Sequence, residues 1–273
     1  MKNLTSAGIA MLNAILGAQV MLARNVLAQG DLDGVLRRLS EEPLDGATLV
    51  QIESRPPDPR IIPALEAAFA DKGAKEEKQK IASSLIRLGD RSGVYFEFLA
   101  AYVRLAIADR SPLFLEYDEH GRSIRGAISA EFENWCALNH KDQSEIIGRQ
   151  LYGYPSDVLN LAQANDTRAV DLFQEALDSP YPGVIGFAVQ GLGRLNAVSA
   201  IQRISDSVDR LHAGDRSVVA SQLPWFAGGQ AEQLLQRLVP IAAYRDRYRQ
   251  DVQRQRDGEL KRVLSRQGRA MQE

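Results

Sequence analysis

The chain is poor in the residues from which most catalytic and metal sites are built. It has one cysteine, Cys136, and three histidines among its 273 residues. A single cysteine excludes an internal disulfide, and no His-Glu-x-x-His or Cys-x-x-Cys spacing of a metal site occurs. A Gly-x-Ser-x-Gly nucleophile motif and a Gly-x-x-x-x-Gly-Lys-Ser/Thr phosphate loop are also missing. The sequence therefore predicts no catalytic, cofactor-binding or metal site.

The chain also lacks a strong excess of charge of either sign. Its 33 basic and 35 acidic residues give a formal net charge of -2. This balance provides no general attraction to nucleic acid, and its sign weakly opposes binding to an anionic membrane. With 45% hydrophobic and 25% charged residues, the composition is that of an ordinary folded protein. We therefore expect a folded protein that does not bind nucleic acid.

The first 28 residues differ in composition from the rest of the chain. Lys2 is followed by an apolar run from Ile9 to Ala23, and no acidic residue occurs before Asp31. This layout, with Val26-Leu27-Ala28 before a cleavage point, is typical of a secretory signal peptide. We therefore predict a signal peptide over residues 1–28 and a mature protein that is periplasmic or secreted.

Two other interpretations of this segment stay open. Asn13 and Gln19 interrupt the apolar run, and Arg24 lies close to the cleavage point. These features also fit an uncleaved anchor or the first helix of a cytosolic protein. The run is short for a membrane span, which takes about 20 apolar residues. After cleavage we expect no stable membrane span.

Two arrays of helices follow. From Leu44 onward, apolar residues recur at helical spacing and predict helices over residues 61–69, 81–88 and 94–105. A second array is predicted over residues 170–177, 184–195, 198–211, 217–226 and 231–239. Short breaks containing glycine or proline separate neighbouring helices, and such breaks favour antiparallel pairs.

A short segment recurs between the two arrays. Residues 192–201, which begin Leu-Gly-Arg-Leu, repeat the residue pattern of residues 85–94, which begin Leu-Ile-Arg-Leu. A small unit that recurs in this way cannot bury its apolar face alone, so it stacks on copies of itself. The pattern therefore predicts an all-α solenoid of antiparallel helix pairs in one domain, residues 31–243. Leu88 and Leu195 are predicted to be the last buried apolar anchors of their helices.

These segments resemble a known repeat family. Residues 165–170 (Asn-Asp-Thr-Arg-Ala-Val), 179–184 (Ser-Pro-Tyr-Pro-Gly-Val) and 192–195 (Leu-Gly-Arg-Leu) look like the HEAT repeat, especially its short bacterial variety, also called lyase-type HEAT-like. Residues 58–65 and 88–91 resemble it again. The resemblance implies an armadillo-type stack of helix pairs that serves as a scaffold or interaction surface. The matching positions are packing positions, so the enzymatic name of the subfamily implies no activity.

Residues 111–164, between the arrays, form an atypical insertion. Residues 113–117 and 122–126 flank a turn in which Gly121 supplies the positive φ, which predicts a short β-hairpin. A helix is predicted over residues 129–138, with its first residue, a serine, as the N-cap. Because an isolated hairpin is marginally stable, we expect it to lie against the helices. It is either structural filler or the recognition element.

The insertion contains the residues that come closest to a catalytic set. Cys136 and His140 are four positions apart on a predicted helix, and Trp135 precedes the cysteine. A cysteine nucleophile needs a partly exposed environment that favours the thiolate, whereas this apolar stripe predicts a buried structural thiol. The alternative to a scaffold is therefore a hydrolase or lyase with a pocket near Trp135, Cys136 and His140.

The turn of the hairpin holds the densest set of possible metal ligands. They are Glu116, Asp118, Glu119 and His120. Side chains of a turn diverge, and no second histidine lies nearby to complete a transition-metal site. We therefore predict a solvated turn.

Residues 244–273 are rich in arginine and glutamine. A narrow apolar stripe at helical spacing runs through them, and acidic residues separate the basic ones. The pattern predicts a polar C-terminal helix that closes the last apolar face of the solenoid, or else a partner-binding or oligomerising helix. The acidic residues argue against nucleic-acid binding. Taken with the repeats, the sequence predicts a non-catalytic exported scaffold that binds another protein through its helical surface, without indicating the partner or the oligomeric state.

Overall fold

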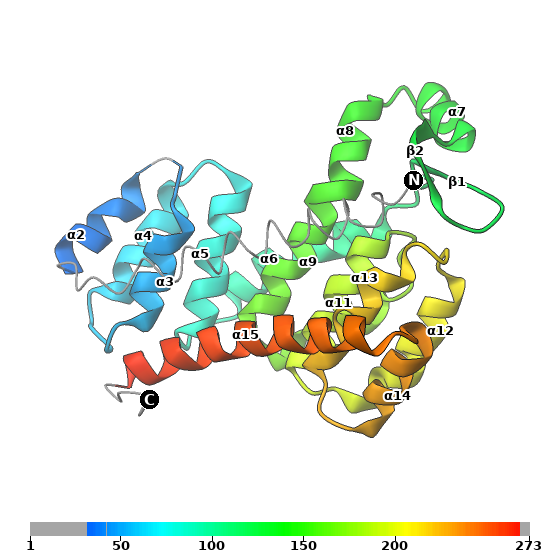
Figure 1. The fold of residues 1–273 in the computed structure, drawn as a ribbon. Coiled ribbons are helices and arrows are strands. Elements are labelled where there is room, and N and C mark those ends of the chain that lie inside the picture. Colours follow the sequence, from blue (N-terminus) through cyan, green and yellow to red (C-terminus); the bar gives the residue numbers. More distant parts are fainter. Residues whose placement is uncertain (1–31, 42, 268–273) are drawn as a thin grey trace. The chain divides into compact units, whose positions relative to one another are not determined.

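The computed structural model describes residues 32–41 and 43–267 (Figure 1). The signal peptide predicted over residues 1–28 lies outside the described residues. The described chain is mostly helical, as predicted, and its strands form one antiparallel hairpin. It divides into two compact units, one made of the residues up to Phe98 and from Gln250 onward, the other of Leu99–Arg249.

The first unit is built mainly from the N-terminal helices. They are α2 (Leu32–Arg37), η1 (Arg38–Ser40), α3 (Gly46–Ser54), α4 (Ile61–Asp71), α5 (Lys75–Arg87) and the start of α6 (Val94–Ala108). Helix α5 packs against both α3 and α4. Fully buried side chains at the centre of this unit are Ile52, Leu65, Ile81 and Leu85. The helices predicted over residues 61–69, 81–88 and 94–105 are confirmed, although α5 begins six residues earlier than predicted, at Lys75.

The C-terminal helix also contributes to the first unit. Helix α15 (Ala242–Arg266) ends with Arg266, whose guanidinium donates to the carbonyl oxygens of Arg87 at 3.3 Å and Leu88 at 3.1 Å. These carbonyls lie at the C-terminal end of α5, where helical hydrogen bonds run out and a cation interacts favourably with the helix dipole. Val252, on the same stretch of α15, is buried. The end of this helix is thus a packed part of the first unit.

The second unit contains the hairpin and the remaining helices. Strand β1 (Leu115–Tyr117) pairs antiparallel with β2 (Ser123–Ile128), and Gly121 in the turn has the predicted positive φ, 68°. The helices are α7 (Ala130–Leu138), α8 (Gln143–Gly148), η2 (Arg149–Gly153), α9 (Tyr154–Ala164), η3 (Thr167–Ala169), α10 (Val170–Ala176), α11 (Pro182–Arg194), η4 (Val198–Ala200), α12 (Ile201–Arg210), α13 (Arg216–Ala220), η5 (Leu223–Trp225) and α14 (Gly229–Leu238). The π-helical η2 joins α8 and α9 into one continuous helical stretch (Figure 1).

Two details of the second unit differ from the prediction. The helix predicted over residues 217–226 is split into α13 and the 3-10 turn η5, because Pro224 has no N–H to donate and its ring disfavours a continuous α-helix. The insertion, residues 111–164, contains α8, η2 and α9 in addition to the hairpin and α7. Ser129 is the N-cap of α7, but its side chain makes no capping hydrogen bond.

Helix α11 is the centre of the second unit. It packs against α9, α10 and α13, and most of its side chains are buried. A Cβ atom on Gly191 would lie 2.5 Å from the ring of Phe173, and one on Gly193 would lie 2.6 Å from the Cβ of Trp225. These two glycines therefore allow a close approach that a larger residue would prevent.

The prediction that Leu88 and Leu195 are the last buried anchors of their helices is wrong. Both side chains are half-buried, whereas Leu85 and Leu192, three positions earlier, are fully buried. Leu88 and Leu195 are the C-cap residues of α5 and α11. At a C-cap the chain turns out of the helix, so the side chain there loses part of its contact with the core.

Candidate functional site

Trp135, Cys136 and His140, which the sequence offers as the pocket of a hydrolase or lyase, do not form an accessible site. Cys136 is 1% exposed and belongs to a small apolar cluster with Phe132 and Ile146, against which Trp135 packs. Burial and the nearby charge of Asp142 raise the pKa of the Cys136 thiol. Because the thiolate is the nucleophilic form, this environment disfavours the reaction that a catalytic cysteine performs.

His140 ends helix α7. Its φ of 53° is left-handed, and its N–H donates to the carbonyl oxygen of Ala137 at 3.4 Å. The next residue, Lys141, donates its N–H to the carbonyl oxygen of Cys136 at 2.9 Å. These two bonds make up the Schellman pattern that closes a helix. The His140 side chain is exposed, so the residue has a clear backbone role at this position.

We expect His140→Gly to raise the free energy of unfolding by about 0.5–1 kcal/mol, because glycine adopts a left-handed φ without the steric cost of a Cβ atom. Chemical denaturation measures the change. Asn139→Gly is the matched control: Asn139 has a φ of -97° and its side chain donates to the Trp135 carbonyl oxygen at 2.8 Å, so this variant should be less stable than the parent. A destabilised His140→Gly variant would show that the imidazole itself is needed.

In the acidic turn of the hairpin, the Asp118 carboxylate finds its hydrogen-bond and charge partners within the turn itself. One carboxylate oxygen of Asp118 accepts from the N–H groups of His120 and Arg122, each at 2.9 Å, and the Arg122 guanidinium lies 2.8 Å from the other. The hydrogen bonds from Arg122 and His120 lower the pKa of Asp118. Within residues 32–41 and 43–267, no group of three or more His, Cys, Asp or Glu side chains could hold a metal ion.

The base of the insertion contains a buried polar network that the sequence pattern does not indicate. The Tyr181 hydroxyl lies 2.8 Å from Ser111 Oγ and donates to the Ser111 carbonyl oxygen at 3.0 Å. Gln150 Nε2 donates to Ser111 Oγ at 3.0 Å and to the following carbonyl oxygen at 2.8 Å. The Tyr154 hydroxyl donates to Asp109 Oδ2 at 2.6 Å. The segment that leads into β1 is thereby bound to η2, to α9 and to the turn before α11.

The protonation of this network indicates a structural role. Burial tends to raise the pKa of Asp109, but hydrogen bonds from Tyr154 and Ser111 outweigh it and lower the pKa. Burial and the bond to Asp109 raise the pKa of Tyr154 to about 12, and burial also raises the pKa of Tyr181. A general acid or base works best with a pKa near the working pH, so these groups are poorly matched to proton transfer at neutral pH.

A second group of contacts, which we call the clasp, holds the hairpin on the loop between α12 and α13. It consists of Tyr117, Gly121, His212, Gly214 and Asp215. The Tyr117 hydroxyl donates to Asp215 Oδ2 at 2.7 Å, and its ring stacks on the His212 imidazole with centroids 3.7 Å apart. The Gly214 N–H donates to the Gly121 carbonyl oxygen at 3.1 Å. The clasp therefore holds the hairpin on a loop between two helices, whereas the sequence predicted that it would lie against the helices themselves.

Buried charges in the first unit are paired. Burial tends to raise the pKa of Glu53, but the charge of Arg87 and its hydrogen bond to the carboxylate outweigh burial and lower the pKa. Lys72 Nζ lies 3.8 Å from Glu77 Oε2 and donates to the Glu41 carbonyl oxygen at 2.5 Å. Removing one partner of such a pair leaves an uncompensated charge, which gives these groups a role in folding.

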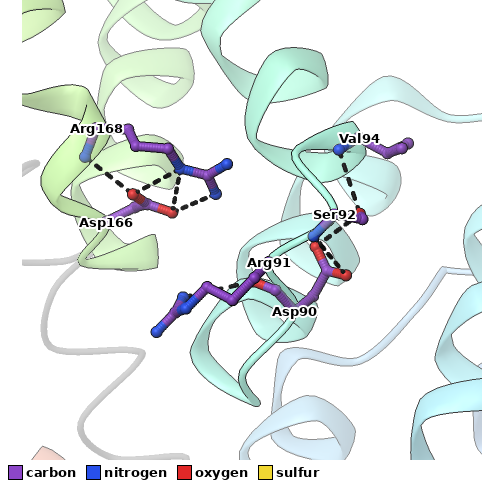
Figure 2. A network of polar contacts seen from close by, with 6 residues as sticks. All are labelled: Asp90, Arg91, Ser92, Val94, Asp166 and Arg168. Carbon is purple, nitrogen blue, oxygen red and sulfur yellow. Dashed lines mark hydrogen bonds and ion pairs between the residues drawn. The ribbon is translucent and has the colours of Figure 1, made fainter.

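The same helix-starting motif occurs in both units. In the second unit, Asp166 accepts from the N–H of Arg168 at 2.9 Å, and the Arg168 guanidinium contacts both carboxylate oxygens, at 3.0 and 2.6 Å (Figure 2). In the first unit, Asp58 accepts from the N–H of Arg60 at 2.9 Å, and the Arg60 guanidinium again contacts both oxygens, at 2.9 and 3.0 Å. The motif of the first unit leads directly into α4, and that of the second unit starts the 3-10 turn η3, which continues into α10.

The second helix of each pair also ends in the same way. Gly89 after α5 and Asn196 after α11 have left-handed φ values of 108° and 50°. The residue after Gly89 donates its N–H to the Leu85 carbonyl oxygen at 3.0 Å, and the residue after Asn196 donates to the Leu192 carbonyl oxygen at 2.9 Å. Leu85 and Leu192 thus occupy equivalent positions in two helix pairs with the same local plan.

A different device starts α6, the helix that follows the first pair. Ser92 Oγ donates to Asp90 Oδ2 at 3.1 Å and accepts from the N–H of Val94, the first residue of α6, at 3.3 Å (Figure 2). The serine hydroxyl thus satisfies one of the amide groups that a helix start leaves without an intrahelical partner. The turn is exposed and joins the end of α5 to the start of α6.

Ion pairs join successive helices of the second unit. Arg203 and Arg210 on α12 contact Asp178, just after α10, at 2.6 and 3.1 Å. Arg237 on α14 contacts Asp209 on α12 at 3.3 Å. These side chains are largely exposed, and each such pair is worth only about 0–1 kcal/mol. These ion pairs place the end of α10 beside α12, and α12 beside α14.

A surface pocket of about 200 Å³ lies in the second unit. Its lining residues are Leu223, Pro224, Phe226, Gly228, Ala231, Glu232, Leu235 and Arg249. The two charged groups pair with each other, with Arg249 donating to Glu232 at 2.5 Å. The lining residues include neither a nucleophile nor an uncompensated charge, so they do not indicate a reaction that the pocket would catalyse.

Comparisons of this chain with protein-family models, with curated proteins and with solved structures gave no match. None of the helices in the described part of the chain has both the length and the apolar character that a membrane span requires. Function is therefore inferred from the recurring helix pairs and from the chemistry of the individual side chains.

Proposed function

We propose that this protein is an exported HEAT-like repeat protein, of armadillo-type architecture, that binds another protein through its helical surface and catalyses no reaction. The observation that carries the proposal is the recurrence of one helix-pair plan in both units. The pairs α4–α5 and α10–α11 begin with the same Asp-x-Arg bond set and end in the same left-handed turn. Repeated helix pairs form extended surfaces, and proteins built from them use those surfaces for binding.

The spacing of contacts in the second unit supports the same proposal. Arg210 and Asp178 are 32 positions apart, and so are Arg237 and Ser205, which are joined by a 3.0 Å hydrogen bond. One helical repeat of this class spans a similar number of residues. Equivalent contacts at one repeat length are expected where each helix lies beside its counterpart in the next repeat.

The alternative function, a hydrolase or lyase with a pocket near Trp135, Cys136 and His140, has weaker support. The thiol is buried and its pKa is raised, and His140 is an exposed helix-ending residue. The periplasmic or secreted location that we propose rests on the sequence of residues 1–28 alone.

Site-specific photo-crosslinking in the native host tests the proposal. A crosslinking amino acid would replace Gln202 on α12 or Gln233 on α14, both exposed, and in the matched control it would replace Gln143, an exposed glutamine in the insertion. We expect one and the same protein to be captured from Gln202 and Gln233, because neighbouring repeats face the same partner. N-terminal sequencing of the purified protein should begin at Gln29.

Three results would contradict this proposal. Capture from Gln143 alone would move binding away from the repeats. No capture at any position, combined with an activity that Cys136→Ser reduces by about a thousandfold in a folded protein, would support the enzyme. A product that still begins with Lys2 or an earlier residue would overturn export while leaving the binding result unaffected.

A further inference from the structure

We propose that the last two turns of α15, residues 259–266, form a latch that closes on the end of α5 and opens about Gly258. The closed latch is held by its arginines rather than by a buried apolar face. When it opens, it releases the end of α5, which belongs to one of the two recurring helix pairs. All of the contacts that hold it lie within the first unit. The latch goes beyond the proposed binding function and does not depend on it, because both of its states are defined within one chain.

Two arginines connect the latch to the rest of the first unit. The Arg266 guanidinium donates to the carbonyl oxygens of Arg87 at 3.3 Å and Leu88 at 3.1 Å, at the C-terminal end of α5. Arg262 acts on the buried Glu53 of α3. Burial tends to raise the pKa of this carboxyl group, but the charges of Arg87 and Arg262 are among the effects that lower it. Such contacts at the surface of a protein are weak, and salt screens them.

Apolar burial contributes little to the closed latch. Among the described residues of α15, Val252 alone is buried, and it lies before Gly258. Within the latch, Leu264 is half-buried, whereas Leu260 is 52% and Val263 is 50% exposed. Most of the stability of a helix in a protein comes from packing of an apolar face, and the latch lacks a fully buried one. The charges of its arginines are therefore the main attraction that keeps it closed.

Gly258 provides the point at which the latch can bend away from the rest of α15. A Cβ atom built on this glycine would meet no described atom within 4 Å, its chain neighbours and its own helix backbone aside. Packing therefore does not require a glycine at this position. Glycine weakens the interior of a helix relative to alanine, because it loses more conformational freedom on folding. Helix α15 is thus weakened directly before the latch.

Distances between paired spin labels test the proposal in the full chain. The labels are attached to cysteines that replace Ser265 in the latch and Lys80 on α5, both exposed, while the native Cys136 is buried and stays unlabelled. We expect the short distance of the closed latch to dominate in about 0.05 M NaCl. In about 1 M NaCl, the open fraction, seen as a longer distance, should be about 3–10-fold larger, because salt screens two partly exposed charge contacts. A second pair, labelled at Gln250 and Lys80, should keep one distance, because Gln250 precedes the hinge.

Three variants identify the interactions responsible. Arg266→Gln removes the cation from the end of α5 and should raise the open fraction in low salt by about 2–5-fold. Lys261→Gln is the matched control: it removes a charge from the same two turns, but from an exposed side chain, and should leave the open fraction unchanged. Gly258→Ala should lower the open fraction in high salt by about 2–5-fold, because alanine strengthens the helix at the hinge.

Four results would overturn the proposal. The first is an unchanged distance between the latch and α5 at both salt concentrations. The second is an equal change for the label pair at Gln250, which would show that the whole helix leaves α5. The third is an equal effect of Arg266→Gln and Lys261→Gln, which would assign the change to overall charge. The fourth is an open fraction that Gly258→Ala does not lower, which would remove the hinge.

Discussion

Leu192→Ala is expected to lower the free energy of unfolding by about 2–5 kcal/mol, through lost apolar burial and the cavity left behind. Leu192 is fully buried on α11, the helix that packs against α9, α10 and α13. Because the surrounding helices meet at α11, they cannot all move inward to fill the space. Chemical denaturation measures the loss.

Leu195→Ala is the matched control for Leu192→Ala. It removes the same atoms from the same helix, but Leu195 is a half-buried C-cap residue, so its loss should be less than half as large. Hydrogen exchange would locate the damage, and we expect amides of Leu99–Arg249 to lose protection before those of residues 46–87. Equal losses for the two leucines would refute the assigned helix register. Uniform loosening of both units would show that they unfold together.

The second large effect is expected in the insertion, where Phe132→Ala should cost about 3–5 kcal/mol. Phe132 is fully buried and meets Phe114 edge-on, with ring centroids 6.4 Å apart. Cys136 and Ile146 complete the cluster. Phe132 is therefore the largest fully buried side chain of the cluster that connects α7, α8 and the segment leading into β1, and its removal should open these elements first.

Leu138→Ala on the same helix is the control, because Leu138 is 81% exposed and its truncation should change stability by no more than about 0.5 kcal/mol. Limited proteolysis distinguishes the two variants: cleavage within residues 111–153 should accelerate in Phe132→Ala and stay unchanged in Leu138→Ala. If Phe132→Ala were as stable as Leu138→Ala, the cluster would have no part in holding the insertion.

Local features explain why the helices of both arrays could be predicted. A helix start such as that after Asp166 is encoded within three residues, because the carboxylate caps an amide only two positions away. A helix end such as that at Gly89 depends on a residue that tolerates a left-handed φ. Where local rules conflict, prediction was less accurate: the apolar spacing over residues 217–226 suited one helix, but Pro224 divided it.

The contacts made by the candidate site residues could not be predicted from the sequence. The pair Cys136 and His140 is conspicuous in the sequence only because both residue types are rare, and the structure gives them packing and helix-ending roles. Neither the buried network nor the clasp could be predicted, since Tyr181 lies 70 positions from Ser111 and Asp215 lies 98 positions from Tyr117. No periodicity relates residues so far apart.

By itself, the sequence determined the helical class of the protein, the breaks between its helices and the turn of its hairpin, because each depends on residues within a few positions of one another. Only the tertiary structure decided that Leu192 rather than Leu195 is the buried anchor, that α9 packs on α11, and that Asp215 receives the Tyr117 hydrogen bond. Burial and side-chain pairing depend on which segments meet in space. That choice is made by the packing of the whole chain, which no short stretch of sequence encodes.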